Sequence, residues 1–243
     1  MGVLFLLRNI LSGNIGFGGI IAYILSTLAV IFITLPVHEY AHGKAAVKLG
    51  DDTPRYQGRL TLNPLAHIDY LGAACILLFG FGWAKPVQVN QRNFRNPKRD
   101  MALTALAGPV SNIILATISL ILYNLVYVLS YNVSALDSLG NISLYVAMFF
   151  AYIAQINIYL AVFNLIPIPP LDGSRLLSAL LPYKYYYALM RYERYIFWGL
   201  LALIWFGILD IPLSYLSNAI MSGVSFIAEL PFKLVQLFIN FNF

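Results

Sequence analysis

Long apolar runs, separated by short polar segments, dominate the pattern of the chain. Two of these runs, residues 9–37 and 101–136, contain no charged side chain. A helix needs about 20 predominantly apolar residues to cross the hydrocarbon core of a bilayer. We therefore expect two membrane-spanning helices, over residues 18–37 and 103–129.

Two further apolar runs follow in the second half of the chain. Residues 144–170 predict a third span, which ends where closely spaced prolines interrupt the helix. Residues 185–209 predict a fourth span with an aromatic belt at its start. The apolar segment after Pro212 either crosses the membrane or lies flat on it. The pattern thus predicts an all-α polytopic membrane protein with about four to six transmembrane helices.

Three segments are expected to depart from this pattern. Residues 71–83 are apolar but short and rich in glycine, which favours a re-entrant or interfacial element over a complete crossing. Residues 85–94 alternate apolar and polar side chains in the manner of a short β element. Residues 1–13 are too short to cross the bilayer and show no cleavage pattern, so we expect a retained interfacial segment there.

Composition agrees with this interpretation. Hydrophobic residues make up 60% of the 243 residues and charged residues only 10%, whereas an ordinary soluble domain is roughly 45–50% apolar. No long polar insert separates the apolar runs, so we expect one membrane-embedded domain over 1–243, with a core at approximately 16–180 and C-terminal helices at 183–243. The single cysteine, Cys75, excludes an internal disulfide bond and a cysteine-rich metal site.

Positive charge is concentrated in two segments, residues 44–99 and 175–194. The positive-inside rule places both segments on the cytoplasmic side, and the loop at 130–141, which has no lysine or arginine, on the outer side. We expect an integral, multi-pass membrane protein, with anionic lipid headgroups as partners of the basic residues. These residues carry no nucleic-acid-binding fold signature, which argues against a nucleic-acid partner.

The end of the first predicted span carries three ionisable side chains in the sequence HEYAH: His38, Glu39 and His42. Residues four apart on a helix project from the same face, so two imidazoles can bind one ion. Glu39 lies too far round the helix to be a comfortable ligand but can hydrogen-bond a metal-bound water, as in the HExxH motif of zinc peptidases. The alternative is a pair of histidines that hydrogen-bond loop carbonyls, which leaves such costly groups at membrane depth unexplained.

A hydrolytic zinc site needs a third protein ligand and a position for water. Five side chains are candidates: His67, Asp69, Cys75, Asp172 and Asp210. Asp172 is favoured because prolines end the third span just before it and a glycine follows, so that irregular backbone can direct its carboxylate inward. The alternative for Asp172 is an ion pair with Arg175. His67 is the second choice, although a loop histidine can also form hydrogen bonds without metal.

Two asparagines, Asn112 and Asn164, lie in otherwise apolar predicted helices. Each can form an interhelical hydrogen bond worth about 0.6–2 kcal/mol or take part in catalysis. The short separation from Asp172 favours a catalytic role for Asn164. For Asn112 both interpretations stay open.

Together these residues resemble the site-2 protease family of intramembrane metalloproteases, especially its small bacterial forms. Five blocks carry the resemblance and occur in the family order: HEYAHGKAA (38–46), GRLTLNPLAHID (58–69), WAKPVQVNQRNFRNPKRD (83–100), ALAGPVSN (105–112) and FNLIPIPPLDGSRLL (163–177). The departures are modest. Tyr70 follows Asp69 where close relatives often carry proline, and the chain shows no inserted PDZ-like module or regulatory domain.

The resemblance implies that His38, His42 and Asp172 hold one zinc ion per chain and that Glu39 is the catalytic carboxylate. It also implies that Asn164 lies near the catalytic centre, as a possible oxyanion or substrate contact. Asn112 matches another recurrent position of the family. The resemblance to small bacterial forms further implies a bacterial-type plasma membrane. We expect the active site toward the cytoplasmic side and a transmembrane protein as the substrate.

Cleavage within a membrane requires the substrate helix to unwind, which exposes backbone groups that cost several kcal/mol each if they stay unpaired. We expect the segment around Val87 and Val89 to pair with the unwound substrate as a strand edge. Two other functions stay open: a membrane-bound zinc protease that acts on soluble or surface-exposed chains, and a non-enzymatic metal carrier or binding protein. A carrier would distribute polar ligands over several spans, whereas here they concentrate at one depth. The oligomeric state does not follow from the sequence.

Overall fold

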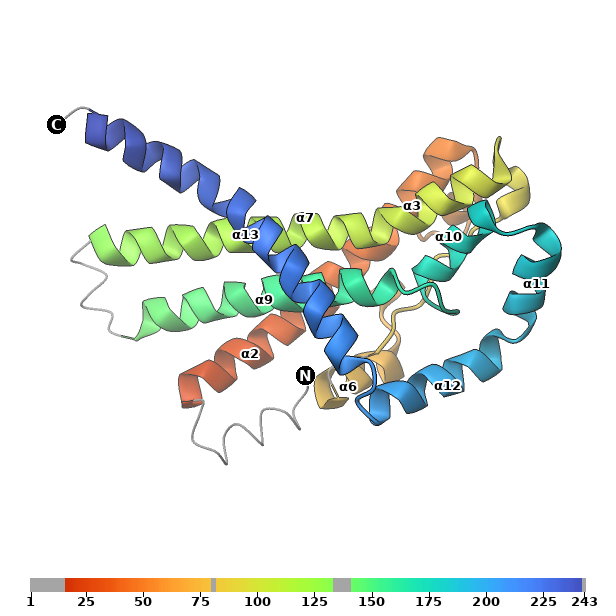
Figure 1. The fold of residues 1–243 in the computed structure, drawn as a ribbon, viewed down its shortest axis with the longest axis horizontal. Helices are drawn as coiled ribbons and strands as arrows, with labels where there is room; N and C mark the ends of the chain where they lie inside the picture. Colours follow the sequence, from red (N-terminus) through yellow and green to blue (C-terminus); the bar gives the residue numbers. More distant parts are fainter. Residues whose placement is uncertain (1–15, 80–81, 133–140, 242–243) are drawn as a thin grey trace.

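The structure of the protein is a computed structural model that describes residues 16–79, 82–132 and 141–241. All regular secondary structure in these ranges is helical. Four helical segments are long and apolar enough to cross a membrane: Phe17–Leu49, Pro97–Ser130, Ile142–Asn164 and Asp210–Lys233. The chain is therefore an all-α polytopic membrane protein, as its sequence predicts (Figure 1). The predicted interfacial segment at 1–13 and most of the predicted outer loop lie outside the described residues.

The first span is a continuous helical segment with three parts: α2 (Phe17–Ala29), the π-helical turn η1 (Val30–Thr34) and α3 (Leu35–Leu49). The π-helical turn ends four residues before His38, the first residue of HEYAH, and such turns are frequent next to functional sites. α3 ends at Gly50, whose φ of 111° lies in the left-handed region that glycine adopts without strain. A span is thus confirmed here, and its helix continues well beyond residue 37.

The second and third spans, α7 (Pro97–Asn132) and α9 (Ile142–Asn164), lie side by side, and α13 (Asp210–Phe241) crosses both (Figure 1). Where they meet lies an apolar cluster of Ala116, Leu120, Ala154, Ile158, Val162, Leu213, Val224 and Ala228. Alanines at this contact let the backbones approach closely. In a membrane, close packing of this kind drives helix association, because lipid tails are as apolar as the side chains.

The predicted fourth span at 185–209 is wrong. This region forms two short helices, α11 (Tyr183–Arg191) and α12 (Glu193–Trp205), neither of which is long enough to span a bilayer. Charged residues at their junction interrupt the apolar pattern, and Gly207 turns the chain after α12 with a φ of 69°. The fourth candidate span is instead α13, where Pro212 lies in the first turn and removes no intrahelical hydrogen bond.

Short elements connect the first two spans: α4 (Thr53–Tyr56), α5 (Pro64–His67), α6 (Tyr70–Phe79) and η2 (Gln91–Asn93). Helix α6 has only ten residues. Trp83 lies back against its start, so close that a Cβ atom on Gly72 would collide with the carbonyl oxygen of Trp83. The chain therefore turns back after α6, as a re-entrant element requires.

The predicted β element at 85–94 is not formed, because residues 82–90 pair with no other described segment as a strand. Their backbone N–H groups have other acceptors. Val87 donates to the Glu39 carboxylate (2.8 Å), and Asn90 donates to the Asp51 carboxylate (2.7 Å). Since side chains satisfy these donors, the segment needs no partner strand to hold it in place.

After α9, the proline-rich residues 165–171 lead into α10 (Asp172–Leu180), which packs against α7. Helices α11 and α12 then form an arc beside the bundle (Figure 1). This return of the chain brings the start of α10 close to α3.

Candidate metal centre

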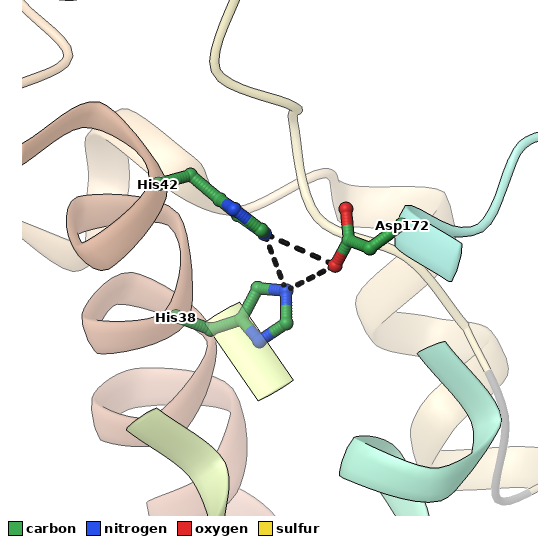
Figure 2. Close-up of side chains that lie close together, drawn as sticks. All are labelled: His38, His42 and Asp172. Atoms are coloured by element: carbon green, nitrogen blue, oxygen red, sulfur yellow. Dashed lines mark hydrogen bonds and ion pairs between the residues drawn. The ribbon is translucent and has the colours of Figure 1, made fainter. Parts of the chain in front are cut away.

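Helix α3 brings His38 and His42 to one point, as their spacing predicts (Figure 2). The Nε2 atoms of the two rings lie 3.0 Å apart. Both side chains are buried, with only 6% of His38 and 3% of His42 exposed. One face of the helix thus presents two imidazole nitrogens to the same small space.

Asp172, the first residue of α10, completes the cluster. Its Oδ2 lies 3.1 Å from Nε2 of His38 and 3.0 Å from Nε2 of His42 (Figure 2). Gly173 allows this position, because a Cβ atom there would collide with the carbonyl oxygen of Leu165. The proline-rich bend and the glycine together explain how a residue so distant in sequence reaches α3.

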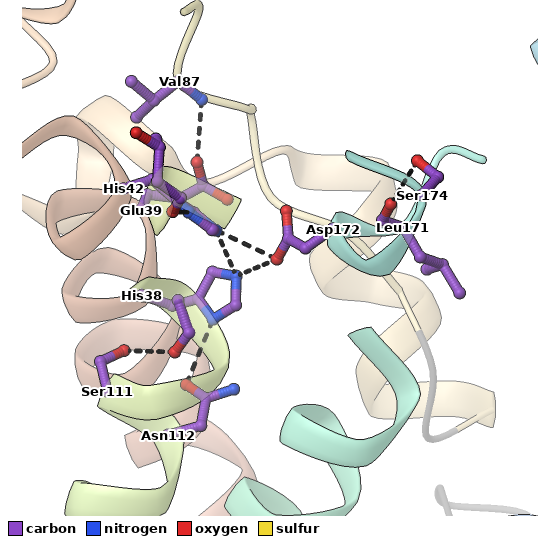
Figure 3. A network of polar contacts seen from close by, with 11 residues as sticks. His38, Glu39, His42, Val87, Ser111, Asn112, Leu171, Asp172 and Ser174 are labelled. Carbon is purple, nitrogen blue, oxygen red and sulfur yellow. Dashed lines mark hydrogen bonds and ion pairs between the residues drawn. The ribbon is translucent and has the colours of Figure 1, made fainter. Parts of the chain in front are cut away.

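The second nitrogen of each imidazole orients its ring. Nδ1 of His42 lies 2.8 Å from the backbone oxygen of Thr104, and Nδ1 of His38 lies 3.3 Å from the side-chain oxygen of Asn112 (Figure 3). Both oxygens can accept a hydrogen bond from Nδ1, an arrangement that directs Nε2 of each ring toward the centre. Metal-binding histidines are commonly held in this way.

Three acceptors therefore converge, with ligand atoms of His38, His42 and Asp172 within 4.8 Å of one another. Burial alone would raise the pKa of the Asp172 carboxyl, but the adjacent His42 and His38 lower it below its usual range, so that the group is an anion. Two imidazole nitrogens and a carboxylate oxygen this close together are stable only around a proton or a cation. Two imidazoles and one carboxylate are a donor set that catalytic zinc uses, so these residues fit a zinc ion.

Gly108 on α7 makes room for the two rings. A Cβ atom at this position would collide with Nε2 of His42 and with the imidazole of His38. Helix α7 therefore contacts the ligands through its backbone, which fixes how closely it approaches α3.

Glu39 lies beside the cluster without belonging to it (Figure 3). Its Oε2 accepts a hydrogen bond from the backbone N–H of Val87 at 2.8 Å. Its other oxygen, Oε1, accepts no hydrogen bond from the described residues. One oxygen is thus anchored, and the other can take a proton.

The three ligands and Glu39 line a cavity of about 790 Å³. Its other walls are largely apolar, with contributions from Leu35, Trp83, Leu160, Phe163 and Phe197. Concave apolar sites with a few convergent polar groups are typical of substrate-binding sites. This arrangement can activate water next to an apolar peptide segment.

The remaining predicted site residues fall in different places. Asn112 contacts His38, so it acts on a ligand. Asn164 and Val87 line the cavity. Val89 packs in a small apolar cluster instead and is not part of the cavity wall.

The other candidate ligands do not join the cluster. His67 is fully buried, and its Nε2 lies 2.8 Å from a loop carbonyl oxygen. Asp69 accepts a hydrogen bond from a backbone N–H in the first turn of α6, Cys75 lies within α6, and Asp210 begins α13. The described residues form only one group of three or more such ligands, that of His38, His42 and Asp172.

Sequence reasoning missed three contributions to this site. The Thr104 carbonyl leaves no signal in a side-chain pattern. Gly108 does leave one, since a glycine within an apolar helix indicates close approach of a neighbour. The third is Asp51, which is fully buried just after α3 and holds residues 90–93 through hydrogen bonds; an acidic residue directly after the helix-ending Gly50 was its signal.

Comparison with known proteins agrees with this geometry. The sequence model of peptidase family M50 matches residues 26–203. "Putative zinc metalloprotease YwhC" of Bacillus subtilis (strain 168) is 45% identical over 164 residues, which cover 66% of this chain and 73% of that protein. "Putative zinc metalloprotease Rip2" of Mycolicibacterium smegmatis (strain ATCC 700084 / mc(2)155) is 28% identical over 149 residues, which cover 58% of this chain and 51% of that protein.

No solved structure shows a significant match. The family match extends over most of the chain and includes all three converging residues and Glu39. The chain therefore belongs to peptidase family M50, the family of the site-2 proteases.

Proposed function

We propose that this chain is a zinc-dependent endopeptidase that hydrolyses peptide bonds within or near the transmembrane segments of other membrane proteins. One observation carries the proposal: His38, His42 and Asp172 converge beside Glu39 in a largely apolar cavity of a membrane protein. Relatives named as zinc metalloproteases support the chemistry. The position of both histidines on a membrane-spanning helix supports the class of substrate.

His38, His42 and Asp172 would hold one zinc ion. When bound, the ion acts as a Lewis acid and lowers the pKa of its water to about 7. Thr104 and Asn112 keep the two imidazoles in the tautomer that binding requires.

Glu39 serves as the general base. Because the Val87 N–H holds Oε2, Oε1 is positioned to take a proton from the attacking water and to return it to the departing amine. The Asn164 amide, in the wall of the same cavity, is a candidate donor to the negative charge that develops on the scissile carbonyl oxygen.

The substrate must present an unwound backbone to this site, and its freed polar groups need partners. Five residues of the segment that follows α6 line the cavity with Glu39: Gly82, Trp83, Ala84, Pro86 and Val87. Their backbone carbonyl groups can accept hydrogen bonds from such a substrate segment. Main-chain pairing with this segment would replace the hydrogen bonds that the substrate loses on unwinding.

The charge distribution supports a cytoplasmic active site. The basic segment at 44–99 follows His42 in the sequence, and the basic segment at 175–194 follows Asp172. By the positive-inside rule, this end of the bundle faces the cytoplasm, and the bilayer's anionic headgroups are its neighbours.

The variant Glu39→Gln tests the enzyme assignment, because glutamine keeps the shape of the side chain but cannot act as a base. We expect it to fold and retain zinc, and to cleave a reconstituted single-span substrate about 10²–10⁴ times more slowly. The matched control is Glu229→Gln, which removes an exposed ion pair with Lys233 outside the cavity and should leave the rate unchanged. Undiminished cleavage by Glu39→Gln would refute the assigned base.

A second comparison tests the substrate class. The same segment is offered once in a bilayer and once as a detached soluble peptide, and fragments are identified by mass spectrometry. An intramembrane protease cleaves the embedded form; cleavage of the detached form alone would assign the chain to soluble substrates.

A further inference from the structure

Three arginines line the metal-site cavity at the side formed by α10, α11 and α12. They are Arg175 on α10, Arg191 at the end of α11 and Arg194 on α12. None of them forms an ion pair or a hydrogen bond with another described residue. One carboxylate, Glu193, shares this wall, so positive charge predominates there.

These arginines belong to the same space as the metal ligands. Arg175 follows Asp172 by three residues on α10, which places both on neighbouring positions of one helix face. Arg175, Arg191, Arg194 and Glu193 all line this one cavity, so the charged groups of the three helices share its wall. Figure 1 shows the same three helices as an arc around this side of the site.

Unpaired arginines beside an apolar cavity are suited to bind an anion. The guanidinium group offers donors in a planar fork that matches a carboxylate, and it keeps its charge at any physiological pH. A cavity with apolar walls screens this attraction less than open water does. The same cavity thus combines an apolar wall, which suits an unwound apolar segment, with an arginine wall, which suits an acidic side chain next to it.

We infer that Arg175, Arg191 and Arg194 select substrates that carry an acidic side chain close to the cleaved segment. This inference rests on the proposed function. Anionic lipid headgroups are the competing source of a negative group. Substrate is favoured because these arginines line the cavity that contains His38 and Asp172. Lys184 on α11 offers the contrast: it is exposed, as Arg191 and Arg194 are, but it does not line the cavity.

The experiment uses the full-length protein with its zinc, reconstituted in vesicles of zwitterionic lipid. Two single-span substrates differ only in the cytoplasmic flank of the cleaved segment, which carries either two glutamates or two glutamines. We expect the wild type to cleave the acidic substrate faster. The double variant Arg191→Gln/Arg194→Gln should reduce this preference by about two- to fivefold per arginine, the range for exposed ion pairs. Lys184→Gln is the matched control and should keep the wild-type preference.

Charge reversal sharpens the test. Arg191→Glu/Arg194→Glu should cleave a substrate with two lysines in the flank faster than the acidic one. Cleavage of the glutamine substrate by the same variants reports whether they fold and retain the active site. If the variants cleave all substrates equally slowly, the arginines have a structural role and the inference is overturned.

Two further outcomes separate the inference from the proposed function. If the wild type cleaves acidic and neutral substrates at the same rate, the selectivity is refuted while the protease assignment stands. If it cleaves neither although zinc is bound, both are refuted. The same assay in vesicles with added anionic lipid completes the experiment. Cleavage rates could depend on the anionic lipid and on Arg191 or Arg194, but not on the charge of the substrate flank. That result would show that the arginines bind lipid headgroups and would overturn the inference.

Discussion

The two imidazoles of the metal centre pack against the backbone of α7 at Gly108. This contact leaves no space for a Cβ atom, and the same helix supplies the Thr104 carbonyl and the Asn112 amide that orient the rings. The ligands of α3 are therefore positioned by their neighbour. In the apolar interior, where polar partners are few, such backbone contacts decide whether two histidines point at one ion.

Gly108→Ala should therefore damage the metal site with little effect on the rest of the fold. The added methyl group would displace both imidazoles, and we expect zinc affinity to fall by about 10–100-fold, the usual effect of disturbing the groups that orient ligands, with cleavage reduced accordingly. Zinc titration and thermal unfolding measure the two effects separately. Gly223→Ala on α13, where a Cβ meets no atom within 4 Å, is the control. Equal zinc affinity in both variants would contradict this view of Gly108.

The sequence predicted the residues of the site where the geometry within one helix or one bend brings them together. His38 and His42 lie four apart on a helix, and this spacing alone brings them together. The approach of Asp172 was predictable from the prolines that end α9 and the glycine that follows. The contact of Asn112 with His38 was not, because it depends on how α7 packs against α3, which no spacing within one helix determines.

At the scale of elements, residues 82–90, which follow α6, are held against α3 by side-chain hydrogen bonds. Glu39 lies within α3, and Asp51 lies just after it. The carboxylates of both residues accept hydrogen bonds from backbone N–H groups of this segment. Two carboxylates thus hold in place a segment whose sequence pattern is typical of a strand. The alternating pattern predicted a strand here, which is not formed, because the backbone N–H groups of Val87 and Asn90 are bound by side-chain acceptors that lie far away in sequence.

Val87→Pro and Val87→Ala separate the backbone of this segment from its side chain. Proline removes the N–H that holds Glu39, whereas alanine keeps it. A hydrogen bond to a charged group is worth about 1.5–3 kcal/mol, so we expect kcat to fall roughly ten- to hundredfold in Val87→Pro and much less in Val87→Ala. Steady-state cleavage of a reconstituted substrate gives both values. Similar rates for the two variants would show that the N–H does not orient the base.

Asp51 should contribute a pH-dependent part of the stability. Burial would raise the pKa of this carboxyl, but hydrogen bonds from Thr53, Asn93 and Asn90 together lower it below its usual value. A lowered pKa in the folded state stabilises the fold above the unfolded pKa of about 3.9, and the contribution is lost as the pH falls below that value. Asp51→Asn should therefore reduce the free energy of unfolding by about 1–3 kcal/mol at pH 7.

Thermal unfolding in detergent at pH 7 and near pH 3 measures this effect. The difference between wild type and Asp51→Asn should shrink at the lower pH. Asp52→Asn, which removes only an exposed ion pair with Arg55, is the control and should change stability little at either pH. A penalty for Asp51→Asn that is the same at both pH values would show that the charge of Asp51 is not involved.

At the scale of the whole molecule, hydropathy predicted three of the four spans because length and the absence of charge are sufficient there. It failed at 185–209, where the apolar run contains Arg191, Glu193 and Arg194. These charges divide α11 from α12 and face the metal-site cavity. The departure from the span pattern thus coincides with the part of the structure that carries the proposed selectivity.

The proposed function depends on the return of the chain after α9, which brings one carboxylate from α10 to two imidazoles on α3. The proposed chemistry requires that these three groups hold one metal ion. The zinc content of gently purified protein tests this requirement directly, with elemental analysis of the wild type, Asp172→Ala and the control Asp210→Asn. We predict about one zinc per chain in the wild type and the control, and a large loss in Asp172→Ala. A wild type without stoichiometric metal, or full occupancy in Asp172→Ala, would contradict it.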